Sequence, residues 1–458
     1  MRALGCRAWY LGAALLGLVS MSAQAGDWTL TNSLSLQSIF SDNINQAANG
    51  KAGVLLTASP HVDLKGTGRR VSGNLSYAPS LFADLGGNAR SNGINHYLNA
   101  AFNSELLRNE LFLDTRASAG LITTNTAANY GQDALNYRDN ASQVYTFSLS
   151  PYAQHRFGSA ANLLFRLNGD RVQSDTSGSQ LNSTALNGLL QLSSGTRFTR
   201  FPWSVSARRQ ETRYDVRTDQ RDSLNASLGY RIDRRWRVDG NIGHQANRIV
   251  TSRTESGGMD YSGTVYWTPS PRTDIEAQLG QRYFGTFWKV RGSHQSRRTN
   301  LTLDISRDIS NARTLALNQD FLNQGIAVIE PLNEDFLSTQ VGLNATVSGR
   351  RTDVSMGIRW DDRRYEVTPD ETQVLSLSLD ANRRMTPSLS GNVHMSWQGV
   401  QASASDDSQY LDFGVGVSRT LGRYSHVGIN LSHGQRTSKT AAEFTENRIG
   451  LTLTTRMF

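Results

Sequence analysis

One histidine and one serine have a spacing that could do chemistry. His294 and Ser296 lie two positions apart. On a strand such residues share a face, so the histidine could activate the serine hydroxyl as a nucleophile. The apolar residues that follow, Leu301, Leu303 and Ile305, are odd-numbered. We therefore expect His294 and Ser296 to face the opposite, polar side of the sheet.

Other catalytic arrangements are absent from the sequence. None of the eight histidines has the H-E-x-x-H spacing of a zinc protease, and no G-x-S-x-G elbow occurs. Cys6 is the single cysteine, which excludes a disulfide scaffold and a cysteine-based zinc cluster. We expect no catalytic residue, no metal site and no cofactor, and we predict that the protein is not an enzyme.

Arginines and carboxylates form the larger pattern. The chain has 47 basic residues, and the lysines among them are only Lys51, Lys65, Lys289 and Lys439. Many arginines and acids alternate with apolar residues, which places them on the polar faces of strands. The alternation predicts a set of pore-lining residues, namely Arg116, Arg166, Asp170, Arg208, Arg237, Asp239, Glu276, Arg282, Asp304, Arg359, Asp361 and Asp380.

These charges have two interpretations. Planar guanidinium groups match carboxylates, phosphates and sugar hydroxyls, so the wall could guide an anionic or hydroxyl-rich solute. Alternatively, the charges pair with one another and stabilise a water-filled lumen that has no chosen substrate. Doublets such as Arg234-Arg235 and Arg350-Arg351 fall at short turns and are expected at the periplasmic rim. Nucleic acid is not an expected partner, because the chain begins with an export signal.

The elements that must position these side chains are strands. Apolar residues recur at every second position in long rows, for example Trp236, Val238 and Ile242, with polar residues between them. No sustained helical period follows the N-terminal segment. The rows span about 11–14 residues, which is longer than soluble strands and enough to cross a bilayer when tilted. Because lipid offers no partner for a sheet edge, the sheet must close.

We therefore predict an all-β fold: a transmembrane antiparallel up-and-down β-barrel of outer-membrane type, with about 20–22 strands. Tight turns alternate with longer polar connections, which is typical of short periplasmic turns and longer outer loops. The connections Thr123–Asn140 and Asn323–Asn333 are candidate plugs of the lumen. We also expect strands near Phe284–Arg298 and Thr314–Phe321, and a tight turn at Ser310–Ala312.

The N-terminal segment has the features of a signal peptide. Arginines precede the apolar stretch Ala8–Met21, and Ala23-Gln24-Ala25 forms a small-residue cleavage site. We expect residues 1–25 to be cleaved and residues 26–458 to form the outer-membrane barrel domain. A hydrophobic content of 38% suits this domain, because only every second residue of a barrel strand must face lipid.

The last predicted strand runs from Arg448 to Phe458. A terminal phenylalanine is frequent in outer-membrane barrels, which predicts recognition by the barrel assembly machinery through this strand. The apolar residues of the strand are out of phase with Phe458, namely Ile449, Leu451, Leu453 and Met457. This phase leaves open how the strand is recognised.

Four segments carry a family resemblance: Phe40–Ile44, Pro60–Ala83, Glu105–Ser118 and Gln281–Arg307. They resemble the outer-membrane β-barrel proteins associated with PEP-CTERM/exosortase and exopolysaccharide gene clusters. The resemblance implies an envelope barrel linked to polysaccharide secretion, and it supplies no catalytic residues. The spacing of His294 and Ser296 resembles outer-membrane phospholipases, which place such a pair on the lipid-facing side.

We expect a channel or scaffold for exopolysaccharide export in the bacterial outer membrane. The expected partners are outer-membrane lipid, polysaccharide and periplasmic export components. One alternative is a general porin for small solutes, and another is a phospholipase-like outer-membrane hydrolase. A soluble secreted β-protein is the structurally distinct alternative.

Overall fold

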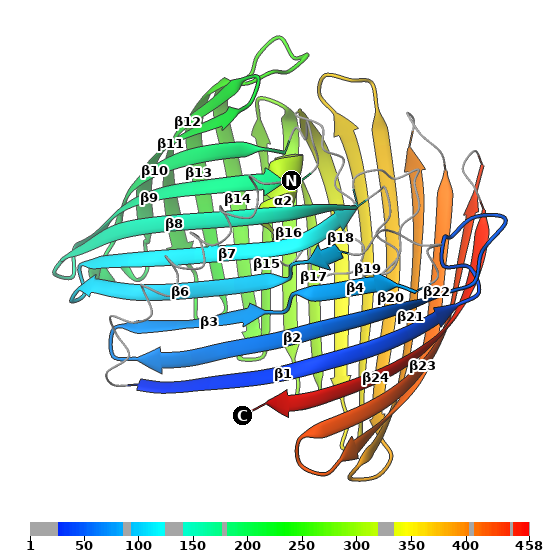
Figure 1. Cartoon of the computed structure of the whole chain (residues 1–458). Coiled ribbons are helices and arrows are strands. Elements are labelled where there is room, and N and C mark those ends of the chain that lie inside the picture. The colour runs from blue at the N-terminus through cyan, green and yellow to red at the C-terminus, as the bar shows by residue number, and fades with distance from the viewer. Residues whose placement is uncertain are drawn as a thin grey trace.

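Antiparallel strands close into a barrel of 22 strands in the computed structural model of this chain (Figure 1). The structure describes residues 26–85, 93–123, 141–175, 181–318, 334–402, 407–439 and 443–457. The predicted signal peptide and Phe458 lie outside these residues. The fold and the strand number confirm the predicted outer-membrane type of barrel, and they rule out the alternative of a soluble β-protein.

The first half of the barrel contains β1 (Gly26–Ser41), β2 (Gly53–Gly68), β3 (Val71–Tyr77), β4 (Ser80–Asp84), β5 (Gly93–Asn95), β6 (Leu98–Leu107), β7 (Leu111–Thr123), β8 (Ala141–Phe157), β9 (Ala161–Ser174), β10 (Ser183–Ser194), the 3-10 turn η1 (Thr196–Phe198), β11 (Trp203–Tyr214) and β12 (Thr218–Arg231). The second half contains β13 (Trp236–Arg248), β14 (Gly258–Ser270), β15 (Thr273–Arg282), β16 (Gly285–Gln295), β17 (Thr299–Asn311), the helix α2 (Ala312–Leu317), β18 (Asp335–Ser348), β19 (Thr352–Tyr365), β20 (Glu371–Arg384), β21 (Leu389–Ala402), β22 (Ser408–Leu421), β23 (Ser425–Ser438) and β24 (Phe444–Met457).

Two barrel strands are interrupted, which is why the segments outnumber the strands. β2 pairs with both β3 and β4, and the break between them falls at Ala78 and Pro79. β5 and β6 continue the next strand, with a break at His96 and Tyr97. Proline has no N–H to donate to the ladder, so Pro79 favours this interruption.

The barrel closes between its first and last strands. Asn32–Ser41 of β1 pairs with Arg448–Met457 of β24. Closure satisfies the edge N–H and C=O groups that lipid could not. With an even number of strands, both ends of the barrel chain lie on the side of the short turns, which is the periplasmic side in outer-membrane barrels.

The two faces of the wall differ as the alternation predicts. Leu224, Leu228 and Ile242 point outward and are 56%, 63% and 55% exposed. Their neighbours along the chain are polar, and Ser204 and Ser227 share a hydrogen bond of 2.6 Å between their hydroxyl oxygens. Large exposed apolar side chains are stable on the outer face only because lipid, and not water, surrounds them.

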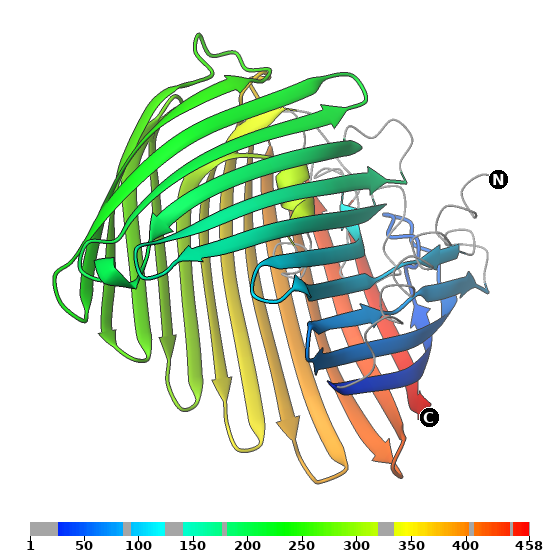
Figure 2. The same ribbon diagram turned by 90° about the vertical axis from the view of Figure 1, so that its left-hand side faces the viewer.

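The connection after β17 enters the barrel. β17 continues to Asn311, and the chain then forms the short helix α2 inside the wall (Figure 2). The Asn311 side chain caps the helix by accepting a hydrogen bond of 2.9 Å from the Thr314 N–H. The predicted tight turn at Ser310–Ala312 and the predicted strand from Thr314 are therefore wrong, because a capped run of helix-forming residues replaces them.

The other predictions about connections have different outcomes. The strand near Phe284–Arg298 is confirmed by β16. The candidate plugs Thr123–Asn140 and Asn323–Asn333 lie outside the described residues, apart from Thr123 at the end of β7. α2 belongs to the same connection as the second candidate. Within the described part of the chain, no helix is long and apolar enough to cross a membrane.

Candidate functional site in the barrel lumen

The predicted pore-lining residues share the inward-facing side of the wall. Asp170 of β9 contacts Arg313 of α2, which lies in the lumen, so this face of β9 is the inner face. Cross-strand register extends the same face to the neighbouring strands, for example from Asp170 to Ser148 and from Ser148 to Arg116. Whether these residues line a conducting path stays a prediction.

Most of the predicted residues are ion-paired along the wall. The pairs are Arg166 with Asp114 at 2.8 Å, Arg237 with Asp239 at 3.1 Å, Glu276 with Lys289 at 3.7 Å, Arg282 with Asp308 at 2.9 Å, Asp304 with Arg291 at 2.8 Å, and Asp361 with Arg363 at 2.7 Å. Among the described residues, Arg116, Arg208 and Asp380 have no ion pair. Mutual pairing is what the second interpretation of these charges expects.

Tyrosine rings support two of the inner arginines. The Arg166 guanidinium lies 4.1 Å from the centre of the Tyr152 ring, and the Arg237 guanidinium lies 3.8 Å from that of Tyr266. Such cation–π contacts hold the guanidinium plane in place. These arginines therefore present fixed donors to the lumen and are not freely moving charges.

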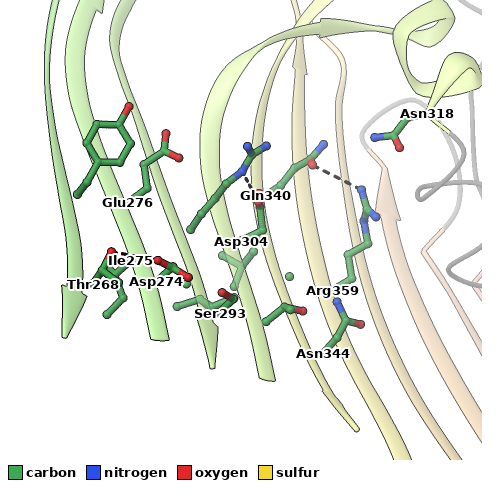
Figure 3. A pocket seen from close by; sticks show the side chains of 17 residues that line it. Thr268, Asp274, Ile275, Glu276, Ser293, Asp304, Asn318, Gln340, Asn344 and Arg359 are labelled. Carbon is green, nitrogen blue, oxygen red and sulfur yellow. Dashed lines mark hydrogen bonds and ion pairs between the residues drawn. The ribbon is translucent and has the colours of Figure 1, made fainter. Parts of the chain in front are cut away.

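A cavity of about 580 Å³ lies against the inner face of β14–β19 (Figure 3). Its wall combines carboxylates, guanidiniums, amides and hydroxyls. Arg359 donates to Gln340 at 3.5 Å, and Thr268 donates to Asp274 at 3.0 Å. Asn318, the residue after α2, lies above the other labelled side chains and lines the upper edge of the cavity.

α2 crosses the extracellular part of the lumen and is anchored on the facing strands. Arg313 forms an ion pair with Asp170 and donates to the Ser183 hydroxyl at 3.0 Å. Burial lowers the pKa of Arg313 to about 10, which still leaves the guanidinium charged at neutral pH. The apolar side of α2 packs in a cluster with residues of β7, β8, β9, β18 and β19, namely Ile122, Val144, Val172, Phe336 and Tyr365.

Further ion pairs tie the extracellular connections together. Arg253, between β13 and β14, binds both carboxylate oxygens of Glu366, between β19 and β20, at 2.5 and 2.8 Å. The hydrogen bonds to Glu366 raise the pKa of Arg253. Arg221 of β12 pairs with the buried Asp335 of β18. These contacts join strands that are distant along the sheet and narrow the extracellular opening.

The alternation did not predict Arg253, Arg313, Asp335 or Glu366 as site residues. Arg253, Arg313 and Glu366 lie in connections, and Asp335 is the first residue of β18, so none of them belongs to an alternating row. The only signal in the sequence was the length of the connections that contain or adjoin them.

The structure overturns the expected orientation of His294 and Ser296. His294 lies opposite the outward Leu301 in the register, so His294 also faces outward. The outward residues are even-numbered in β16 and odd-numbered in β17, because the turn between these strands changes which positions face lipid. His294 shares a hydrogen bond of 2.8 Å with Thr273. Ser296 lies in the turn and accepts the N–H of Thr299 at 3.1 Å. The histidine and serine therefore bond to different partners in this structure.

Metal chemistry has no support in the described part of the chain, where no group of three metal-ligating side chains occurs. Together, the closed 22-strand barrel, its apolar outer face and its polar lumen define a protein of the bacterial outer membrane.

No protein-family model matches the sequence, and no curated protein matches it. Among solved structures, the siderophore receptor PirA from Acinetobacter baumannii is 7% identical, with a TM-score of 0.52 over 93% of this chain and 80% of that chain. The ferric enterobactin receptor PfeA from Pseudomonas aeruginosa is 10% identical, with a TM-score of 0.50 over 95% of this chain and 82% of that chain. These likenesses show the barrel fold alone.

Proposed function

We propose that the protein is a gated channel that carries hydroxyl-rich polymers across the outer membrane, as in exopolysaccharide export. The observation that supports this most is a polar, hydrogen-bonding inner wall whose described crossing element, α2, obstructs only the extracellular part of the lumen. Barrels with many strands enclose a wide lumen, so loops must supply any closure.

The chemistry of the cavity suits sugars. Its amides and hydroxyls both donate and accept hydrogen bonds, as the hydroxyl groups of a sugar require. Its charges are largely paired, so the cavity would bind the hydroxyl groups of a saccharide and would not hold its charged groups tightly. The family resemblance of the sequence points to the same substrate class.

The proposal is tested by reconstituting residues 26–458 in planar bilayers. We expect a small baseline conductance with discrete openings, and block of the open state by neutral oligosaccharides. A steady, unblocked conductance would favour a general porin. A silent barrel that releases no oligosaccharide from vesicles would favour a scaffold, and either result would overturn the proposal.

A matched pair of variants connects the block to the cavity. Asn344→Leu removes an inner amide of the cavity and should weaken saccharide block. Val347→Leu changes an outward residue of the same strand and should leave the block unchanged. Equal effects of the two variants would separate the block from the cavity.

A further inference from the structure

The arginines of the inner wall differ between the two ends of the barrel. Toward the extracellular end they are buried and neutralised. Arg363 pairs with Asp361, and Arg448 pairs with Asp412; all four of these side chains are at most 4% exposed. Arg221 and Arg313 are paired in the same way with Asp335 and Asp170. This end carries little unbalanced positive charge on its inner wall.

The periplasmic end carries unbalanced positive charge. Arg156, Arg231, Arg384 and Arg456 lie at or near the periplasmic ends of β8, β12, β20 and β24, and we call this set the arginine collar. All four side chains are exposed. None of them has an ion pair among the described residues, whereas most of the other inner-wall arginines that the structure describes are paired.

The register places the collar on the inner face. Arg231 lies opposite Arg237, whose partner Asp239 is also on the inner wall. Arg456 follows Thr454 by two positions, and Thr454 bonds to Ser35 across the closing seam. Arg384 continues the row of Asp380, opposite to the outward Leu377. The collar therefore surrounds the aqueous mouth.

The short turns add to this charge. The exposed doublets Arg234-Arg235, Arg297-Arg298 and Arg350-Arg351 occupy three of them. Acids also lie at this end, namely Asp27, Glu105, Glu110, Asp233, Asp274 and Asp353. Within the described residues, none of them is at ion-pair distance from these arginines. The periplasmic mouth is thus basic overall.

A different set of arginines faces outward, where phospholipid headgroups can bind them. Arg200 donates to the Tyr230 hydroxyl at 2.9 Å, and Tyr230 belongs to the outward row of β12 with Leu228. An outward arginine beside an aromatic ring suits the lipid boundary. The collar faces the opposite side of the wall, which headgroups do not reach, so its partner must be a solute that enters the mouth.

We propose that the arginine collar captures an anionic polysaccharide, one that bears carboxylate or phosphate groups, on the periplasmic side. This inference rests on the proposed function and names its substrate class. Guanidinium binds such groups through paired hydrogen bonds. Each exposed contact is weak, but a polymer meets several at once, and a charged mouth raises the local concentration of its ligand.

The test compares two triple variants in phosphatidylcholine nanodiscs, with a fluorescent oligogalacturonate as the probe. The inner variant carries Arg231→Gln, Arg384→Gln and Arg456→Gln. The outer control carries Arg200→Gln, Arg383→Gln and Arg419→Gln. Arg383 lies one position from the inward Arg384, and Arg419 continues the outward row of Val415 and Val417, so the control removes the same charge from the lipid side. We expect the inner variant to weaken binding at least about tenfold and the control less than about twofold, with binding falling as salt rises.

Three results would overturn the collar: no binding of the probe, an equal weakening of neutral dextran binding by the inner variant, or equal losses of probe binding in both variants, which would indicate a lipid-type rim. Unchanged heat-modifiable gel mobility verifies that both variants keep the barrel. Because binding is measured without conductance, the two proposals can fail separately. Binding by a silent barrel would support the collar and overturn the channel, whereas conductance without probe binding would do the reverse.

Discussion

The extracellular and periplasmic halves of the lumen are built from the same strands, but their charged side chains are arranged differently. In the extracellular half, α2 and the ion pairs of Arg253 and Arg313 join distant strands across the opening. In the periplasmic half, small polar residues and exposed arginines line the wall. A buried ion pair costs desolvation and fixes one arrangement, whereas an exposed charge stays available to a ligand.

The two ends differ in how deeply their arginines are buried and in how far away their partners lie, and not in the presence of charge. Arginines alternate with apolar residues at both ends of the strands. At the extracellular end, carboxylates from connections and from distant strands reach them. Pairs nearer the periplasmic end, such as Arg237 with Asp239, stay within the wall. One residue type therefore forms buried ion pairs at one end of the barrel and stays exposed at the other.

The largest expected effect comes from removing the crossing element. Replacing residues 312–334 with a short Gly-Ser linker between β17 and β18 should raise the conductance severalfold, because the helix no longer crosses the lumen. Single-channel recording measures this change, and shortening the connection after β21 serves as the control. An unchanged conductance would show that the extracellular half is not the narrow part.

Breaking the anchor of α2 should have the next largest effect. Arg313→Met leaves the buried Asp170 without its partner, which typically costs about 3–5 kcal/mol. We expect this free-energy cost to detach α2 from the wall. The detachment should raise the open probability of the channel and speed proteolysis of the connection. Adding Asp170→Asn should recover most of the docking. A double variant as impaired as the single one would contradict the pair's role.

The comparison of the two ends of the lumen depends on which face of the wall is inner. Substitutions at two neighbouring residues of β13 test this assignment. Ile242→Arg places a charge in lipid and should lower the free energy of unfolding by about 2–4 kcal/mol. Asn241→Arg faces the lumen and should change it little. Denaturant unfolding from vesicles measures both variants, and equal losses would refute the face assignment.

The smallest effect concerns Arg237, an inner arginine that is half-buried and supported by a tyrosine ring. Tyr266→Leu removes the ring beneath Arg237 and should cost about 0.5–1 kcal/mol of stability. Tyr261→Leu, on the outer face of the same strand, removes a ring without this contact. Thermal unfolding should separate the two, and an equal change would mean that the cation–π contact contributes nothing.

Most of the barrel was predictable because its strands repeat every two residues. The apolar rows through Ile242 and Leu228 correctly indicated the outer face, and the arginines between such rows were correctly placed on the polar face. The prediction failed for His294, because one hairpin turn exchanged the parity of the faces. It also failed at α2, because a six-residue helix is too short to show a period.

By itself, the sequence determined a closed β-barrel with a lipid-facing and a water-facing side, since alternation and the absence of hydrogen-bond partners in lipid permit little else. Only the tertiary structure decided which charges pair. Arg313 meets Asp170, Arg253 meets Glu366 and Arg221 meets Asp335 across more than a hundred residues of chain. Strand spacing carries no information about such contacts, because they depend on how the barrel closes and which connection turns inward.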